Sequence, residues 1–333
     1  MQQFSHPGRS LVEISPSVSA DTLIADLVPP PEFMNARFST YVPDQRFPSQ
    51  ANAVSACKEF AGGKKKLFGK KEIAPGIYLD GGFGVGKTHL LASIWHQHKG
   101  KKLFGAFLDM TAITGYLGFA EMAKRLSNYE LICIDEFELD DPGDTMIMSR
   151  LLKELSQAGV RFAATSNTPP NALGEGRFAA ADFKREIQGL GERFNIVSVD
   201  GEDYRHRDID AHSELFLFEQ IQEQITEDVT VDSFHDLLRH LSTLHPTKFR
   251  YLLTGVKGIV LTDAKKLISQ VDALRFVSFI DRAYEQQIPI RATGDVSLTD
   301  VFTDEMIAGA YRKKYLRCVS RTSALSARDF PNS

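Results

Sequence analysis

The feature that most constrains this chain is the run of eight residues at 81–88, which has the spacing G-x-x-x-x-G-K-T. It follows a β-prone run at 77–79 and precedes a segment in which Leu90, Leu91 and Ile94 recur at helical spacing. Glycines let the backbone turn successive N–H groups inward, and a following helix presents its partly positive amino end, so the loop can enclose an anion. The run therefore predicts a strand, a triphosphate-binding loop and a helix. The simpler alternative is a glycine-rich turn with a solvated lysine.

Two polar side chains of this loop have separate expected roles. Lys87 would reach the β- and γ-phosphates of ATP, and the Thr88 hydroxyl would be a ligand of Mg²⁺. A dinucleotide-binding G-x-G-x-x-G loop is excluded, because Lys87 stands where its third glycine would be. The residues expected to contact the nucleotide are Gly81, Gly82, Phe83, Gly84, Val85, Gly86, Lys87, Thr88 and His89.

Length and composition are those of ordinary globular proteins. The chain has 333 residues, of which 43% are hydrophobic and 25% charged, enough for one large or two modest domains. Its net charge of −4 does not favour a broad contact with nucleic acid. The three cysteines have no paired spacing, and the sequence shows neither a signal peptide nor an apolar run long enough to span a membrane. We therefore expect a cytoplasmic protein in a reducing compartment.

Three segments are expected along the chain. Residues 1–70 form a proline-rich arm with a helix at 50–60, residues 71–209 alternate β-prone and helical runs, and residues 210–333 hold a helical lid and an α/β region. The strands expected in the middle segment are 76–79, 103–108, 131–134, 160–165 and 195–199. This alternation predicts an α/β P-loop NTPase fold, with a parallel sheet covered by helices.

The C-terminal segment carries weaker signals. Residues 210–244 are expected to be mainly helical, with Ser233 as a cap, and a strand, a helix and a strand are expected at 258–261, 271–286 and 288–292. A shift of 128 residues places Asp135 on Asp263, so the region is either a degenerate repeat or a βαβ unit that aligns by chance. Because this half has no phosphate loop, any active site belongs to the first half.

Two adjacent acids, Asp135 and Glu136, directly follow the apolar run at 131–134. A buried strand that ends in this way delivers carboxylates beside the phosphates. Asp135 is expected to hold Mg²⁺ together with Thr88. Glu136 is expected to polarise the attacking water, because in-line attack on the γ-phosphate needs an oriented nucleophile. The alternative is a strand that ends in a solvated acidic loop, since further acids follow.

A polar side chain is also expected between the metal and the water. The β-prone run at 160–165 is followed by Ser166 and Asn167. An amide there can hydrogen-bond both the γ-phosphate and the water without adding charge, which makes Asn167 a candidate phosphate sensor. The other interpretation is that Asn167 starts the turn before Pro169 and Pro170.

These motifs, in this order, resemble those of the ZapE family of AAA+ cell-division ATPases, which is related to mitochondrial Afg-type ATPases. The resemblance rests on the stretches 81–88, 134–137, 164–170 and 203–205, and it is looser in the C-terminal part, where Arg317-x-x-x-Arg321 is similar. It implies an AAA+-like fold and an ATPase at the division septum, with a tubulin-like division-ring protein as partner. The stretch 104–110 departs from the His- and Phe-rich sequence usual in relatives, which weakens the transfer of the partner more than that of the ATPase chemistry.

The resemblance also implies a homo-oligomer, because AAA+ proteins generally complete the site with an arginine from the next subunit. Arg193, just before the last expected strand of the core, is the preferred candidate and Arg185 the second. Each could instead be an exposed cation at a helix end. In the arm, Phe38 and Tyr41 either stack on adenine or belong to the core.

Three functions compete at this stage. The first is a Mg²⁺-dependent ATPase that remodels a protein partner. The second is a helicase loader or replication initiator, since residues 86–91 are similar to that group, although no helix-turn-helix tail is evident and the acidic balance argues against DNA. The third is a nucleotide-gated scaffold with incidental turnover. The lack of an Asn-Lys-x-Asp motif does not by itself decide between ATP and GTP.

Overall fold

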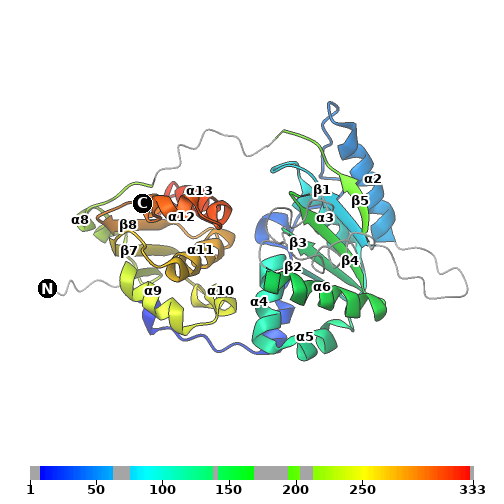
Figure 1. Cartoon of the computed structure of the whole chain (residues 1–333). Coiled ribbons are helices and arrows are strands. Elements are labelled where there is room, and N and C mark those ends of the chain that lie inside the picture. Colours follow the sequence, from blue (N-terminus) through cyan, green and yellow to red (C-terminus); the bar gives the residue numbers. More distant parts are fainter. Residues whose placement is uncertain (1–7, 63–75, 138–141, 169–193, 203–212, 331–333) are drawn as a thin grey trace, which may run out of the picture. The chain divides into compact units, whose positions relative to one another are not determined.

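The structure, a computed structural model, describes residues 8–62, 76–137, 142–168, 194–202 and 213–330. The chain forms two compact units (Figure 1). The central unit is Ser19–Arg207, and the terminal unit joins Met1–Val18 to Asp208–Ser333. The expected arm at 1–70 is therefore divided, because its first residues belong with the C-terminal part of the chain.

The central unit is built on a five-stranded parallel sheet in the order β2-β3-β4-β1-β5. Its strands are β1 (Gly76–Asp80), β2 (Lys102–Ala106), β3 (Leu131–Asp135), β4 (Arg161–Ser166) and β5 (Phe194–Ser198). The strands β1, β3 and β4 are almost completely buried, and β1 and β3 are mostly apolar, as in parallel sheets covered on both faces. All five strands predicted from the sequence are present, and the carboxyl ends of β1, β3 and β4 meet at one edge.

Helices cover both faces of this sheet (Figure 1). Helix α3 packs on β3 and β4 and against α2, where Leu90 and Leu91 join Cys133 in the core. Helices α4, α5 and α6 pack on one another on the other face. The helices lie on opposite faces because parallel strands are joined by right-handed crossovers. The chain moves one way along the sheet from β1 to β2 and the other way from β2 to β4, so the connecting helices fall on different faces. The helices are α1 (Ala20–Ala25), α2 (Pro48–Gly62), α3 (Lys87–Gln97), α4 (Phe107–Leu117), α5 (Phe119–Leu126) and α6 (Pro142–Gln157).

The second strand is shorter than the sequence predicts. The expected strand at 103–108 is wrong at its end, because β2 stops at Ala106 and Phe107 begins α4. Apolar residues continue from the strand into Phe107 and Leu108, and Gly105 lies inside the strand, so the sequence does not mark the boundary itself.

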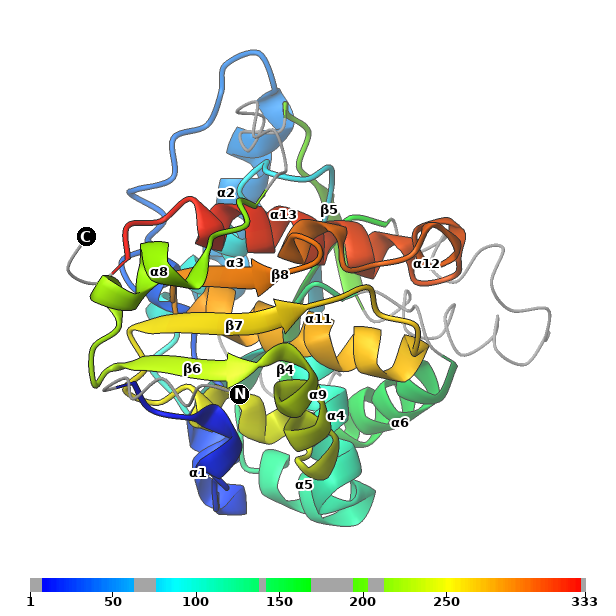
Figure 2. The same cartoon turned by 90° about the vertical axis from the view of Figure 1, so that its left-hand side faces the viewer.

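The terminal unit contains a three-stranded parallel sheet in the order β6-β7-β8, whose strands run side by side in Figure 2. Its strands are β6 (Val229–Ser233), β7 (Gly258–Ala264) and β8 (Ile290–Gly294). Its helices are α8 (Phe218–Ile221), α9 (Phe234–Thr243), α10 (Phe249–Leu252), α11 (Gln270–Glu285), α12 (Asp304–Ala308) and α13 (Arg312–Ser326). The strand, helix and strand predicted at 258–292 are confirmed as β7, α11 and β8.

The segment at 210–244 is helical only in part where the structure describes it, because a strand lies between its helical stretches. Val229–Ser233 forms β6, which pairs with β7 and belongs to the sheet rather than to a helical lid. Its first three residues, Val229, Thr230 and Val231, are all β-branched, and the pairing with β7 lets them fold as a strand. The predicted cap is confirmed, since the Ser233 hydroxyl accepts a hydrogen bond from the Asp236 N–H at the start of α9.

The N-terminal residues complete this sheet. Arg9 lies parallel to Thr230 on β6, with hydrogen bonds to the backbone on either side of it. The Asp232 carboxylate accepts from the Leu11 N–H over 2.9 Å and from the Ser10 hydroxyl over 2.6 Å. Because the Leu11 side chain is fully buried in the core of this unit, residues 9–11 are part of its fold.

The arginine pair noted in the sequence has a structural partner. Arg317 and Arg321 of α13 both bind the carboxylate of Asp281 on α11, over 3.0 and 2.5 Å. Burial opposes ionisation of this carboxylate, but the two guanidinium groups outweigh it and hold the pKa of Asp281 below its usual value. The pair therefore joins two helices of the terminal unit through one buried acid.

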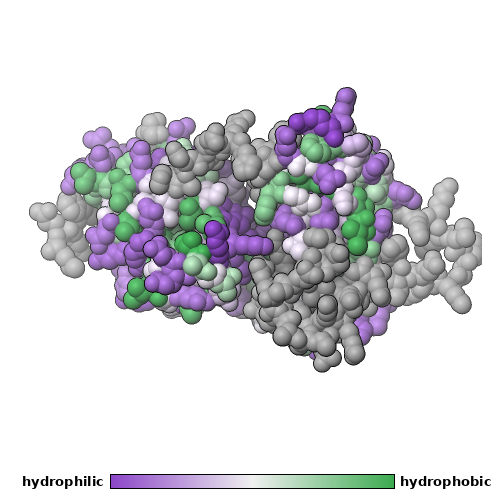
Figure 3. Space-filling model, turned by 45° about the horizontal axis from the view of Figure 1, so that its top comes forward, coloured by the Kyte–Doolittle hydropathy of each residue, from purple (hydrophilic) through white to green (hydrophobic). Residues whose placement is uncertain are grey.

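Apolar residues on the outside of the molecule are scattered. On the face drawn in Figure 3, hydrophobic patches are small and separated by hydrophilic residues. Val42, Leu217 and Ile268 are the most exposed of the large apolar side chains described, and they lie in separate segments. Among the described residues, no helix combines the length and the apolar character that crossing a membrane requires.

Candidate nucleotide-binding site

The loop between β1 and α3 has the backbone that its glycines predict. Gly84 and Gly86 have φ values of 70° and 87°, in the left-handed region where a side chain is strained. A Cβ on Gly86 would also lie 2.6 Å from the ring of Tyr41. Because glycine alone fits both the angle and the contact, the loop closes tightly before Lys87 begins α3.

The ammonium group of Lys87 is held inside the loop. The residue is 8% exposed, and its Nζ donates to the carbonyls of Gly81 and Gly82 over 2.9 and 2.5 Å. It also donates to Asn167 Oδ1 over 3.0 Å. A buried cation whose donors are directed at oxygen atoms of a phosphate loop fits the phosphates of ATP, because phosphate oxygens can replace these acceptors.

Thr88 and Asp135 meet at the edge of the sheet. Thr88 Oγ1 donates to Asp135 Oδ1 over 3.1 Å, and Thr165 Oγ1 on β4 donates to the same oxygen over 2.5 Å. A hydroxyl and a carboxylate suit Mg²⁺, which takes few protein ligands and completes its shell with water and phosphate. The residues present therefore fit the metal that the loop implies.

Burial, with a smaller contribution from the neighbouring Glu136 carboxylate, raises the pKa of Asp135 to about 6. The hydrogen bonds from Thr165 and Thr88 act in the opposite direction. Without a cation, this carboxylate is therefore costly to ionise, and a metal ion would favour its charged form.

Replacing Asp135 with asparagine is expected to stabilise the metal-free protein more at pH 8 than at pH 5. The folded-state pKa of Asp135 is about 6, above its ordinary 3.8, so its contribution to stability is complete below pH 4 and lost as the pH rises through 6. Asparagine does not titrate. The unfolding free energy of the variant relative to wild type should thus grow by roughly 1 kcal/mol between the two pH values. Thermal unfolding in EDTA measures it, and a difference that does not change with pH would contradict it.

Glu136 lies where the chain turns out of β3. Its φ is 51°, and its N–H donates to Thr165 Oγ1 over 3.1 Å. The next N–H, that of Phe137, donates to the Thr165 carbonyl over 2.7 Å. The Phe137 ring is buried against Phe107 and Tyr78. The turn is thus anchored on both sides of Glu136.

The predicted sensor lies beside the loop lysine. Asn167 follows β4, and its Oδ1 is the acceptor from Lys87 Nζ described above. The residues around it are held in place, because the Tyr78 hydroxyl donates to the Thr168 carbonyl over 2.8 Å and the Ser166 hydroxyl accepts from the Thr168 N–H over 3.0 Å. The arginine candidates, Arg193 and Arg185, lie outside the described residues.

The segment before α2 supports the loop from outside. The Tyr41 hydroxyl donates to the Val85 carbonyl over 2.9 Å, and the Tyr41 ring meets the ring of His89 edge-on at 5.6 Å. His89 Nε2 also lies 3.1 Å from the Thr40 hydroxyl. Phe38 is a core residue of the central unit, 9% exposed. Of the two aromatic residues, Tyr41 is therefore the one that contacts the phosphate loop.

Two polar residues of this site were missed by sequence reasoning. The first is Thr165, which contacts both acids. The second is Asp80 at the end of β1. Burial raises the pKa of Asp80, and the nearby charge of Lys87 only partly offsets this. Both stand at the carboxyl ends of strands in a parallel sheet, where ligands bind. That position is the signal that could have found them.

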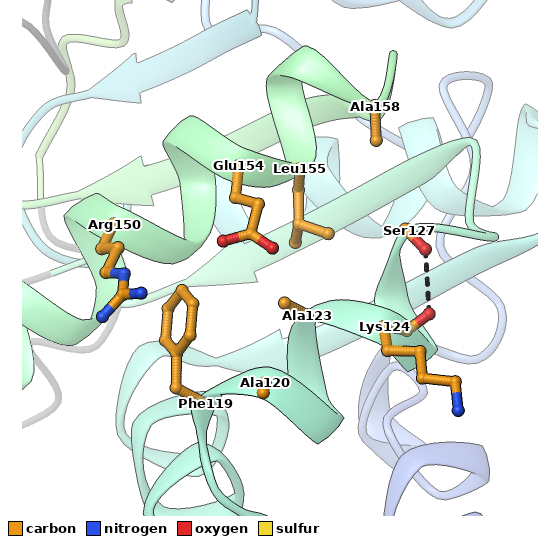
Figure 4. A pocket seen from close by; sticks show the side chains of 9 residues that line it. All are labelled: Phe119, Ala120, Ala123, Lys124, Ser127, Arg150, Glu154, Leu155 and Ala158. Atoms are coloured by element: carbon orange, nitrogen blue, oxygen red, sulfur yellow. Dashed lines mark hydrogen bonds between the residues drawn. The ribbon is translucent and has the colours of Figure 1, made fainter.

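A groove of about 300 Å³ lies elsewhere in the central unit, between α5 and α6 (Figure 4). The guanidinium group of Arg150 stacks over the ring of Phe119 at 4.1 Å at one end of it. The groove is lined by Phe119, Ala120, Ala123, Lys124, Ser127, Arg150, Glu154, Leu155 and Ala158. None of these is a predicted site residue, so the groove is separate from the phosphate loop.

A parallel sheet in the order β2-β3-β4-β1-β5, with a phosphate loop after β1 and two adjacent acids where β3 ends, defines a P-loop NTPase. The sequence model of the AFG1-like ATPase family matches residues 17–238 and 219–332 of this chain. The chain belongs to the AFG1-like ATPase family, and it is an enzyme that binds and hydrolyses ATP.

Individual relatives agree with this family. The cell division protein ZapE of Escherichia coli (strain K12) is 24% identical over 314 residues, which cover 80% of this chain and 83% of that protein. Lactation elevated protein 1 homolog B of Danio rerio is 30% identical over 164 residues, 42% of this chain and 33% of that protein. The resemblance to the ZapE family is thereby confirmed. Among solved structures, that of DnaI matches with a TM-score of 0.44 and 19% identity, over 53% of this chain and 94% of that one.

Proposed function

We propose that this ATPase works with Mg²⁺ and uses ATP hydrolysis to remodel a protein partner in bacterial cell division. The observation that carries the chemistry is the meeting of the phosphate loop with the ends of β3 and β4. Thr88 Oγ1 lies 3.1 Å from Asp135 Oδ1, and Lys87 Nζ lies 3.0 Å from Asn167 Oδ1. These distances support a single site for phosphate, metal and water.

Each side chain has its own role in the proposed mechanism. Thr88 and Asp135 would hold Mg²⁺, which neutralises charge on the β- and γ-phosphates when bound. Lys87 exchanges its bonds to the loop carbonyls for bonds to phosphate oxygens. Glu136 orients the attacking water and accepts its proton as general base, and the amide of Asn167 hydrogen-bonds the γ-phosphate.

The proposal includes a homo-oligomer with sites shared between subunits. An arginine from the neighbouring subunit, Arg193 or in second place Arg185, would stabilise charge on the transferred phosphoryl group. Support for Arg193 is its sequence position directly before Phe194, the first residue of β5.

The cellular role in this proposal comes from relatives. A protein named for cell division aligns with 80% of this chain, which supports a role at the division site for both units together. The proposed partner is a tubulin-like division-ring protein, by family resemblance. The acidic net charge favours a protein partner over nucleic acid.

A trapped complex tests this function. The Glu136→Gln protein, loaded with ATP and Mg²⁺, is expected to retain its partner, so that the tubulin-like division-ring protein co-purifies from cells. The Lys87→Ala protein should not retain it. Salt-sensitive binding of DNA by the trapped form, without the division-ring protein, would contradict the proposal in favour of a helicase loader. Full remodelling by Glu136→Gln would favour a nucleotide-gated scaffold instead.

A further inference from the structure

A buried hydroxyl group, that of Thr165, lies between the two acids of the site. Thr165 belongs to β4, which is next to β3 in the sheet. Its side chain is 2% exposed. Because it is enclosed by protein, any effect of Thr165 on hydrolysis is transmitted through the residues that it touches.

The Thr165 hydroxyl binds both acids at once. Its oxygen donates its proton to Asp135 Oδ1 over 2.5 Å and accepts from the backbone N–H of Glu136 over 3.1 Å. A hydroxyl has one proton and two lone pairs, so both bonds can be made together. One side chain therefore sets the direction of the first carboxylate and the backbone position of the second acid.

The backbone of Thr165 holds the same turn. Its carbonyl accepts from the Phe137 N–H over 2.7 Å, and the Phe137 side chain is 1% exposed. Glu136 lies between these anchors with a φ of 51°, a conformation that residues other than glycine seldom adopt without support from their surroundings. The bond from its N–H to the Thr165 hydroxyl supplies part of that support.

We propose that Thr165 is a positioning residue for ATP hydrolysis, whose hydroxyl orients the Asp135 carboxylate for the metal and holds Glu136 in the conformation from which it acts on water. This inference rests on the roles proposed above for the two acids. Side chains that hydrogen-bond a metal ligand commonly change metal affinity or activity by about 10- to 100-fold when they are removed.

The test is a Thr165→Val variant, which removes the hydroxyl and keeps the shape of the side chain. Its kcat is expected to fall about 10- to 100-fold, while its affinity for ATP changes by less than about threefold. Its affinity for Mn²⁺, measured by electron paramagnetic resonance with a non-hydrolysable ATP analogue, should weaken by about tenfold. Thr165→Ser, which keeps the hydroxyl, should stay near wild type in both.

A matched control separates this role from the loss of a buried hydrogen bond. Thr114 is buried in α4, and its hydroxyl donates to the Met110 carbonyl over 2.6 Å. Thr114→Val therefore loses a comparable bond without contact to either acid, and it should keep both kcat and Mn²⁺ affinity. If Thr165→Val does not fold, the comparison of Thr165→Ser with Thr165→Ala replaces it. These two variants differ from each other only by the hydroxyl group.

Two results would overturn the inference: wild-type kcat and Mn²⁺ affinity in Thr165→Val, or losses in Thr165→Ser equal to those in Thr165→Val. Failure of the proposed chemistry itself would be seen elsewhere. In that case Glu136→Gln would hydrolyse ATP at the wild-type rate, whatever the behaviour of the Thr165 variants.

Discussion

ATP binding is expected to be lost when Lys87 is replaced by alanine. The Nζ of Lys87 is enclosed by the phosphate loop, with its protons directed at Gly81, Gly82 and Asn167. Charge-assisted hydrogen bonds to phosphate contribute about 1.5–3 kcal/mol each, so the loss of two corresponds to a weakening of roughly 100-fold or more. Isothermal titration calorimetry with ATP and Mg²⁺ measures this directly.

The control for this substitution is Lys58→Ala, which removes an exposed lysine from α2 in the same unit. It should bind ATP as the wild type does. Thermal unfolding without nucleotide shows whether Lys87→Ala is still folded. Wild-type affinity in a folded Lys87→Ala protein would mean that the loop at 81–88 does not hold the triphosphate.

A Glu136→Gln variant is expected to bind ATP normally and to hydrolyse it about 100- to 10,000-fold more slowly. Glutamine keeps the size of the side chain but cannot accept a proton from water. The N–H of residue 136 keeps its bond to Thr165, so the turn should be preserved. Phosphate release under saturating ATP gives kcat, and calorimetry gives the affinity.

Glu130→Gln is the matched control, because Glu130 directly precedes β3 at its opposite end and its side chain is 65% exposed. It should not change kcat. Should Glu136→Gln release phosphate at the wild-type rate, Glu136 is not the group that acts on the water. If it loses ATP binding as well as turnover, its role is to hold the loop and not to orient the nucleophile.

The strands and the loop of the central unit could be predicted because their signals are local. An apolar run such as 131–134 is a strand buried on both faces wherever it lies in the sheet, and glycines at 84 and 86 meet a backbone requirement inside the loop itself. The errors occur where the local signal is absent or shared. Phe107 continues an apolar run into a helix, and the short β6 depends on its pairing with β7.

The contacts between distant residues could not be predicted in the same way. The bond from Thr165 to Asp135 joins residues 30 positions apart and depends on β4 lying next to β3. The packing of Leu11 into the terminal unit depends on β6, more than 200 residues further along. The sequence around Thr165 or Leu11 contains no pattern from which its contact partner could be predicted.

The sequence by itself determined that this chain has a phosphate loop followed by a helix, a strand that ends in two acids, and the alternation of a parallel α/β sheet. These follow from backbone freedom at glycine and from the burial of apolar strands, which each segment expresses alone. Only the tertiary structure decided that Lys87 meets Asn167, that Thr165 holds both acids, and that residues 9–11 belong to the terminal unit. Such contacts depend on strand order and on hydrogen bonds between segments that are remote in sequence, and no local pattern records them.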